Sequence, residues 1–338
     1  MVATGGIGTG IFMALEGDHT LGREESRPAR LLDLRDYCKL HIVCHYLQRL
    51  LGPGFPVLPV GRVGVDAAGD RLLEEMAQLG LDVSLVGRSD RPTLFSVCFR
   101  YPNGDGGNLT TSLSASSDVR PADLDAALPV LERYRGRGVA IALPEVPLDA
   151  RLRLLASATD HGFLRVATMV PGEVEVALER GLLDLTDLLA LNLDEAAALL
   201  GDPVPPATPD VVQALVTRLS SAHPGLFVVV TAGSRGSWSW DGRTLAHAPA
   251  LPVEVAGTAG AGDAHLAAVV AATVAGASLA DANRFAALVS SLAVSSGHTI
   301  HPELDRAFVA RAAERLGHEL VPEVRRLLEP SHAEDRRG

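Results

Sequence analysis

The chain has 338 residues and a formal net charge of −11; 47% of its residues are hydrophobic and 4% are aromatic. This length is enough for one large α/β domain. The acidic balance leaves no continuous basic surface for a nucleic acid, and no apolar run approaches the ~20 residues that span a membrane. The first residues lack a basic region followed by a cleavage site, so we expect no signal peptide.

Cysteine and lysine usage narrows the class of protein. Cys38, Cys44 and Cys98 are odd in number and show no CxxC spacing, which favours a reduced, cytoplasmic protein over a disulfide-linked one. Lys39 is the only lysine. A Walker phosphate loop and the protein-kinase fold each need a lysine in a specific motif, so both are excluded. A phosphate site would have to consist mainly of backbone N–H groups, a metal and arginines.

The glycines at the start of the chain partly match a dinucleotide-binding motif. Gly6 and Gly8 fit the pattern GxGxxG, but Ile11 stands where the third glycine is required. No clear strand, helix and second strand follow. We therefore do not expect an oxidoreductase that uses a dinucleotide.

The next clear element is a hairpin. Residues 93–100 and 108–114 have strand-like sequences and flank a strong turn signal at 102–107. We expect this hairpin (93–114), with part of the 12–30 segment, to form a small β-strand lid. A lid suits a kinase because a dry site suppresses transfer of the phosphoryl group to water.

Further along, apolar strands alternate with helices. We expect buried strands at 187–191 and 226–231, and helices at 193–200, 261–275 and 279–295. This alternation predicts an α/β fold with a doubly wound, mostly parallel sheet and helices on both faces. The domain organisation that we expect is a single domain over 1–328 and a disordered tail over 329–338.

The residues with the clearest chemical meaning lie at 257–263, Gly-Thr-Ala-Gly-Ala-Gly-Asp, directly before a predicted helix. The glycines allow several N–H groups to point at one place, and a helix N-terminus adds the positive end of its dipole. Asp263 could accept the proton of a substrate hydroxyl as that oxygen attacks phosphorus. Taken alone, such a segment is more often a simple helix cap.

The order of five segments favours the catalytic interpretation. The 257–263 segment resembles the second signature of the ribokinase-like (PfkB) carbohydrate kinase family, Asp-Thr-x-Gly-Ala-Gly-Asp. Four further segments resemble motifs of that family in the same order: Arg62–Gly69, Glu145–Pro147, Asn192–Glu195 and Thr231–Gly236. The resemblance implies an ATP-dependent kinase that phosphorylates a hydroxyl of a small sugar-like acceptor.

The resemblance also implies roles for individual residues. Asp263 would be the general base, and the N–H groups of Gly260, Ala261 and Gly262 would form the anion hole. Glu145 would face the acceptor. The ATP and Mg²⁺ residues would be Asn192, Glu195, Thr231, Gly233 and Gly236, with Glu195 acting on the metal through water. Asn192 and Thr231 each end a predicted strand, where ligands of open α/β sheets bind, and Asn192 and Glu195 lie one helical turn apart.

The region that binds the acceptor in this family matches poorly. The family has an aspartate after its first strand, and the equivalent stretch here, residues 6–11, has no carboxylate. The family also has a diglycine and an asparagine, whose positions fall near Cys38, Lys39 and Val43 here. An aminocyclitol, a modified sugar or a nucleoside is therefore as good a candidate as ribose or fructose. We expect Lys39 or His41 to line the acceptor pocket, with core packing as the alternative. Cys38, His41 and His45 share a helix face, but a fourth metal ligand is lacking.

One departure affects the expected ions. Many members of the family are activated by potassium held partly by the carboxylate that opens the signature, and Gly257 stands at that position here. Glu254 is roughly 10 Å away in an extended segment, at ~3.3 Å per residue. We therefore expect little dependence on potassium.

The alternative function is a catalytically weak or inactive ligand-binding protein with a kinase fold. The missing acceptor residues suggest it, whereas the intact Asp263 and its preceding glycines argue against it. As partners we expect a small-molecule hydroxyl acceptor, no nucleic acid and no membrane, with a homodimer through the lid as one option.

Overall fold

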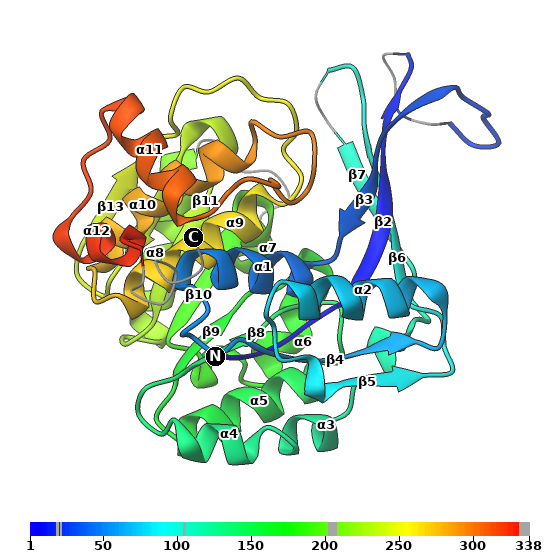
Figure 1. The fold of residues 1–338 in the computed structure, drawn as a ribbon. Helices are drawn as coiled ribbons and strands as arrows, with labels where there is room; N and C mark the ends of the chain where they lie inside the picture. Colours follow the sequence, from blue (N-terminus) through cyan, green and yellow to red (C-terminus); the bar gives the residue numbers. More distant parts are fainter. Residues whose placement is uncertain (18–19, 21, 104–105, 202–207, 331–338) are drawn as a thin grey trace.

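The computed structural model describes residues 1–17, 20, 22–103, 106–201 and 208–330. Within these ranges the strands form a nine-stranded sheet and a separate four-stranded sheet, which projects from one side of the molecule (Figure 1). No helix in the described ranges is both long and apolar enough to cross a membrane. Most of the tail expected at 329–338 lies outside the described residues.

The large sheet is parallel over seven strands and antiparallel at one edge. Its strands, in spatial order, are β13 (Leu245–Ala248), β12 (Ser237–Trp240), β11 (Phe227–Thr231), β10 (Leu188–Asn192), β9 (Leu164–Ala167), β8 (Val139–Ala142), β1 (Val2–Thr4), β4 (Leu58–Gly64) and β5 (Val86–Ser89). The doubly wound, mostly parallel sheet predicted from the sequence is confirmed.

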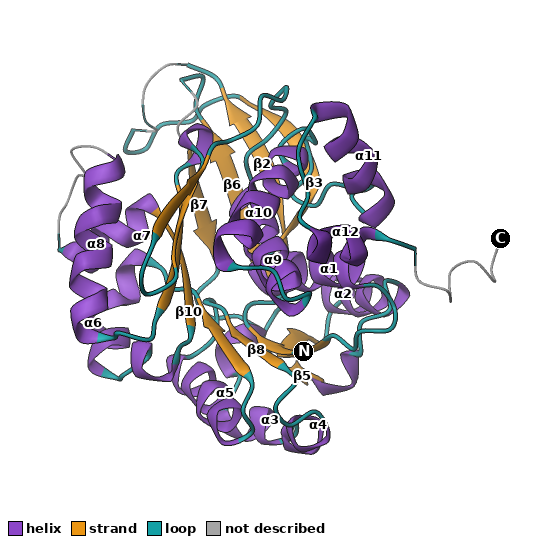
Figure 2. Cartoon of the chain, turned by 90° about the vertical axis from the view of Figure 1, so that its left-hand side faces the viewer, coloured by secondary structure: helices purple, strands orange, loops and turns teal. Residues whose placement is uncertain are grey.

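Helices cover both faces of this sheet because successive strand residues point to opposite sides. Val229 packs in the same core cluster as helices α1, α9 and α10, whereas Val228 and Val230 pack against α7 and α8. Figure 2 shows α8 and α9 on opposite sides of the strands. The helices are α1 (Lys39–Leu51), α2 (Ala67–Gln78), α3 (Pro121–Asp125), α4 (Leu128–Arg133), α5 (Leu148–Asp160), α6 (Val174–Glu179), α7 (Leu193–Leu200), α8 (Thr208–Ala222), α9 (Ala261–Val274), α10 (Leu279–Ala293), α11 (Arg306–Leu316) and α12 (Pro322–Leu328).

The four-stranded sheet, called the small sheet below, has the order β3-β2-β6-β7. Its strands are β2 (Gly8–Leu15), β3 (Ala29–Tyr37), β6 (Leu94–Arg100) and β7 (Gly106–Thr110). The hairpin predicted at 93–114 corresponds to β6 and β7. Lid strands were also expected within the 12–30 segment. Strand β2 begins before this segment, and strand β3 ends after it.

Asp66 joins the small sheet to the large one. It caps α2 by accepting a hydrogen bond from the Gly69 N–H at 2.8 Å, and it also accepts from the N–H and hydroxyl of Thr93 at 2.8 and 2.6 Å. Burial would raise the pKa of Asp66, but these hydrogen bonds outweigh it and lower that pKa. The first of the family-like segments therefore fixes the start of β6 to the end of β4.

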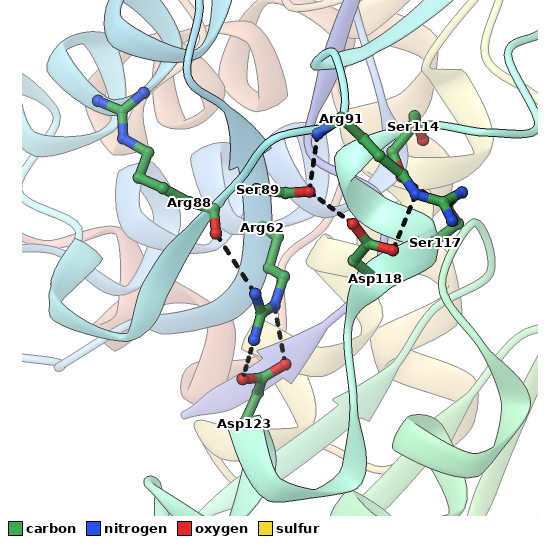
Figure 3. Close-up of polar contacts among 8 residues, drawn as sticks. All are labelled: Arg62, Arg88, Ser89, Arg91, Ser114, Ser117, Asp118 and Asp123. Atoms are coloured by element: carbon green, nitrogen blue, oxygen red, sulfur yellow. Dashed lines mark hydrogen bonds and ion pairs between the residues drawn. The ribbon is translucent and has the colours of Figure 1, made fainter.

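A second polar network supports the same junction (Figure 3). The Arg62 guanidinium donates to both carboxylate oxygens of Asp123, at 3.0 and 2.7 Å. Asp118 accepts from the Ser89 hydroxyl at 2.6 Å and pairs with Arg91 at 3.0 Å. The paired arginines thus tie α3 and the loop before it to β4 and to the segment after β5.

We predict that Asp66→Ala lowers the free energy of unfolding by about 2–3 kcal/mol, because it removes a helix cap and two further hydrogen bonds to a carboxylate. Urea denaturation would measure the change. Asp70→Ala is the matched control: Asp70 lies on the same helix, its side chain is 70% exposed, and it pairs with Arg88 at the surface. We expect a loss below about 1 kcal/mol for the control. Equal losses for the two variants would contradict this role of Asp66.

Candidate active site

Two polar residues lie next to each other at the carboxyl edge of the large sheet. Asn192 ends β10, Thr231 ends β11, and the two are paired in the register of these parallel strands. Asn192 also caps α7: its side-chain oxygen accepts from the Glu195 N–H at 2.9 Å, and its own N–H donates to the Glu195 carboxylate at 2.8 Å. This capping box holds Glu195, which is 7% exposed, at the strand end.

The glycine turn before α9 has the geometry expected of an anion site. Gly260 precedes the first residue of α9 with a φ of 77°, and a Cβ there would collide with the carbonyl oxygen of Thr299. Only glycine fits this position without strain. Asp263 then lies in the first turn of the helix with its side chain 15% exposed. The carboxylate and the N-terminal N–H groups of α9 therefore share one location.

Lys39, at the start of α1, lies close to this carboxylate although it is distant from it in the sequence. It is the first residue of α1, and its Nζ lies 3.5 Å from Asp263 Oδ1. The start of α1 rests on the loop after β1, because the N–H groups of Cys38 and Leu40 donate to the carbonyls of Gly8 and Gly6. Contacts with the N-terminal loop thus direct the only lysine of the chain at Asp263.

Glu145 completes the group from the loop after β8. Its carboxylate lies 3.4 Å from the Lys39 N–H, and its backbone has a φ of 73°, which is uncommon for a residue with a side chain. A Cβ on Gly6 would collide with this carboxylate. Gly6 is therefore explained by the close approach of Glu145, which agrees with the exclusion of a dinucleotide motif.

The carboxylates shift each other's pKa. Burial raises the pKa of Glu195 to about 7; the Asn192 N–H and the Lys39 charge oppose this shift, and Asp263 adds to it. Burial also raises the pKa of Glu145 to about 7, with Lys39 opposing and Asp263 adding. The pKa of Asp263 is raised by burial against the effect of Lys39. Asp263 is the main reason that the pKa of Lys39 rises above its ordinary value.

The structure brings together most of the residues that the sequence singled out. The described positions Gly233–Arg235 form one turn of 3₁₀ helix after Thr231, and the Gly236 carbonyl accepts from the Ala232 N–H at 2.8 Å. His41 does not join the group. It is 3% exposed, its ring packs at a tilt against Tyr37 with 4.4 Å between centroids, and it lines a different cavity.

The sequence did not reveal Asp36 of β3, which also faces this region. Asp36 is 2% exposed and accepts hydrogen bonds from Ser96 at 2.9 Å, Cys98 at 3.1 Å and Thr299 at 2.6 Å. Its charge contributes to the raised pKa of Asp263. A carboxylate from the small sheet therefore lies near the site, whereas none follows β1.

The residues present are compatible with Mg²⁺. Among the described residues, no three or more histidines, cysteines or carboxylates are arranged to hold a metal by themselves. Mg²⁺, however, commonly uses one or two carboxylates and completes its shell with water and phosphate. Among the described residues, the carboxylates of Asp263, Glu145 and Glu195 act on the single Lys39, and Asp36 acts on Asp263 and Glu145. This excess of negative charge favours a divalent cation.

Comparison with known proteins decides the family. The profile of the pfkB family carbohydrate kinases matches residues 43–306, which is more than half of the chain. The chain belongs to this family. The resemblance inferred from the five segments is confirmed, and the family is one of phosphotransferases that act on a sugar hydroxyl.

The relatives of this pfkB-family chain carry different names. It is 30% identical over 263 residues to the bifunctional protein HldE of Bradyrhizobium sp. strain ORS 278, a match that covers 71% of this chain and 49% of HldE. It is 27% identical over 237 residues to the ribokinase of Schizosaccharomyces pombe, covering 70% and 72% of the two chains. The chain thus spans about half the length of the HldE relative.

Solved structures share the fold. The ribokinase of Giardia lamblia matches with a TM-score of 0.77 at 19% identity, covering 92% of this chain and 99% of that one. The ribokinase of Arabidopsis thaliana, complexed with ribose and ATP, matches with a TM-score of 0.70 at 22% identity, covering 98% of each chain.

The raised pKa of Glu195 gives a prediction for stability against pH. In the unfolded chain this carboxyl titrates near its ordinary value of 4.5, and in the folded chain at about 7. Its stabilising effect is therefore complete below 4.5 and is lost as the pH rises through 7. Glu195→Gln keeps the oxygen that accepts from Asn192 but cannot ionise. Its free energy of unfolding, relative to the wild type, should rise by about 1–3 kcal/mol between about pH 5 and about pH 8.

Urea denaturation at the two pH values would measure this difference. Asp194→Asn is the matched control, because it removes the same charge from an exposed neighbour in the same turn of α7. The control should change little over this range. A Glu195→Gln variant that tracked the wild type at both pH values would show that the folded carboxyl titrates normally.

Proposed function

We propose that this protein is an ATP-dependent kinase that transfers the γ-phosphate to a hydroxyl of a small sugar-like acceptor. The observation that carries the proposal is the position of Asp263. Asp263 follows the Gly260 turn in the first turn of α9. Its Oδ1 lies 3.5 Å from Lys39 Nζ, and its charge acts on Glu145. A base, an anion site and a cation therefore converge on one point of the carboxyl edge, where ligands of open α/β sheets bind.

In this mechanism Asp263 accepts the proton of the acceptor hydroxyl as its oxygen forms a bond to the γ-phosphorus. The bond from that phosphorus to the oxygen bridging the β-phosphate breaks, and ADP leaves. Lys39 counters the rise in the pKa of Asp263 caused by burial, so the carboxylate remains available as a base. The N–H groups of Gly260, Ala261 and Gly262 would stabilise the charge on the transferring phosphoryl group.

ATP is the proposed phosphoryl donor. The fold neighbour from Arabidopsis is complexed with ATP, and the paired ends of β10 and β11 here offer a polar edge. The residues that would hold ATP are Asn192, Thr231, Gly233 and Gly236. Glu195 would hold Mg²⁺ through water, and the ion would supply charge neutralisation at the phosphates. These assignments rest on the family resemblance and on the geometry of α7 and β11.

The acceptor is proposed only as a class: a sugar, a cyclitol or a nucleoside. Glu145 and Lys39 are the proposed acceptor residues, because both lie beside Asp263. His41 is left out, since its ring packs away from this group. Relatives named for ribokinase and for HldE support a sugar-like acceptor but differ from one another.

We also propose that the small sheet is a lid and that it mediates a homodimer. Strand pairing puts Ile11, Val97 and Leu109 on one face, and Phe95 lies two residues from Val97 on the same face. Leu109 is 66% exposed and Phe95 is 39% exposed. An apolar face of this kind fits an interface between two copies of the sheet.

A cytoplasmic setting would supply ATP and keep the three free cysteines reduced.

A radiolabelled-ATP assay against sugars, cyclitols and nucleosides tests the proposed function. Transfer of label to one acceptor class would support the kinase. The alternative, a ligand-binding protein with weak or no catalysis, requires an acceptor that binds tightly without becoming labelled.

Asp263→Asn should keep folding and nucleotide binding nearly intact but lower kcat by about 10²–10⁴-fold, because it preserves shape and removes only the proton acceptor. Steady-state kinetics and a nucleotide-binding titration would measure both quantities. Asp194→Asn is again the control, with kcat expected to stay near that of the wild type. If Asp263→Asn kept the wild-type kcat, another group would have to be the base.

Glu195→Gln should raise the magnesium concentration needed for half-maximal activity more than it raises the KM of the acceptor. The physical reason is that a neutral amide attracts a hydrated divalent cation less than a carboxylate does. A magnesium titration at saturating ATP and acceptor would measure the midpoint. The same midpoint for variant and wild type would remove Glu195 from metal binding.

Turnover should depend little on potassium. Gly257 supplies no carboxylate, Glu254 is exposed, and the carbonyl of Ser296 lies beside the turn. A monovalent cation would therefore find carbonyl oxygens without a charged ligand. The measurement is turnover in tetramethylammonium buffer with and without potassium chloride at constant ionic strength. Activation of several-fold would mean that carbonyls alone hold the ion.

A further inference from the structure

A cavity of about 730 Å³ lies between α1, α2, β3 and the loop that leads into α11. In Figure 2 helices α1, α2, α11 and α12 lie together on this side of the molecule. In the described part of the chain, the residues that line the cavity do not include Asp263, Glu145 or Glu195. The cavity is therefore separate from the candidate active site, and its volume is typical of a small-molecule site.

One face of α1 carries buried, unpaired polar atoms on residues that line this region. His41, His45, Gln48 and Arg49 follow the spacing of a single helix face and all line the cavity. Each has a buried side-chain atom without a hydrogen-bond partner among the described residues: Nδ1 of His41, Nε2 of His45, Oε1 of Gln48 and Nε of Arg49. Buried polar atoms nearly always have partners, so four on one face need partners that the described residues do not supply.

The charges around the cavity favour an anion. Arg35, Arg49 and Arg306 contribute three positive charges to its wall, and Glu75 and Asp305 contribute two negative ones. Both carboxylates already accept hydrogen bonds from the protein: Glu75 from the Tyr37 hydroxyl at 3.0 Å, and Asp305 from the Phe308 N–H at 2.8 Å. With three arginines against two carboxylates, the net charge of the wall is positive.

The histidines supply neutral partners beside these charges. Burial lowers the pKa of His41 to about 3 and that of His45 to about 4. Both rings are therefore uncharged near neutral pH, and each can exchange hydrogen bonds with a hydroxyl. The Gln48 oxygen needs a donor, which a hydroxyl also provides.

We propose that this cavity is a regulatory site for a small polyhydroxylated anion, and that sugar phosphates are the chemical class that it binds. The hydroxyls would meet the row of unpaired atoms on α1, and the phosphate would meet the arginines. The site is distinct from that of the proposed kinase reaction and does not depend on which acceptor is used there.

The cavity wall is connected to the active site through His298. His298 Nδ1 lies 2.8 Å from the Asp33 carboxylate of the small sheet. The next residue, Thr299, donates to Asp36 and has its carbonyl against Gly260. An anion that binds His298 would compete with Asp33 and so alter how the small sheet is held against the turn before α9. Binding should therefore change turnover.

The experiment compares the wild type with His45→Leu and Arg49→Met, which remove one neutral and one cationic partner. Arg218→Met is the matched control, because Arg218 is exposed on α8, which covers the opposite face of the large sheet. The probes are ribose 5-phosphate and glucose 6-phosphate. Ribose and inorganic phosphate are titrated separately, to measure the binding of the sugar part and of the phosphate part alone. Calorimetric titration gives the affinity, and thermal unfolding shows that each variant is folded.

We expect at least one sugar phosphate to bind the wild type and the control, and to bind either cavity variant roughly tenfold or more weakly. The thermal midpoint of His45→Leu should equal or exceed that of the wild type, because an unpaired buried nitrogen has been removed. A turnover effect of the same sugar phosphate should disappear in Arg49→Met, whereas inhibition by product in the active site would persist.

Three results would overturn the proposal. Neither sugar phosphate binds the wild type up to millimolar concentration; both cavity variants bind as tightly as the control; or inorganic phosphate alone binds as tightly as the sugar phosphates. Because the titration needs no turnover, its outcome is independent of whether the chain is an active kinase. If His45→Leu does not fold, the comparison of Arg49→Met with Arg218→Met decides the question.

Discussion

The attraction between Lys39 and the surrounding carboxylates organises the carboxyl edge of the large sheet. Asp36, Glu145, Glu195 and Asp263 come from four distant segments, and each would repel the others in a partly buried site. Burial, with repulsion from Asp263, raises the pKa of Glu145 and Glu195 to about 7 against the opposing charge of Lys39. The free protein thus has an incomplete charge balance that a metal ion and hydroxyl donors are suited to complete.

The same region couples the small sheet to the anion turn. Asp36 belongs to β3, accepts from Thr299, and thereby fixes a carbonyl against Gly260. A movement of β3 must therefore disturb either this hydrogen bond or the turn that precedes α9. Asp66 holds the same end of the sheet through Thr93, which directly precedes β6. Both attachments therefore lie at the end of the small sheet that meets the large sheet.

The elements that the sequence predicted well are those with strong local signals. Helix α7 follows the predicted bounds, and β10, β11, α9 and α10 differ from them by one or two residues, because caps, glycines and apolar runs mark their ends. Strand β3 could not be predicted, since its pattern is inverted: Leu34 is 64% exposed, whereas Asp36 is 2% exposed. The position of Asp263 followed from its motif, but the direction of Lys39 depends on contacts between α1 and the Gly6 loop that no local pattern encodes.

The single lysine has a chemical consequence for the whole molecule. Every other basic side chain apart from histidine is an arginine, so the surface carries positive charge without side-chain primary amines. Reagents that acylate amines, and enzymes that acetylate or conjugate lysine, have one ε-amino group to modify, and it lies against Asp263. Modification there would replace the charge that faces the carboxylates with a neutral amide. In this protein, any covalent modification of a lysine side chain is therefore a modification of the catalytic centre that we propose.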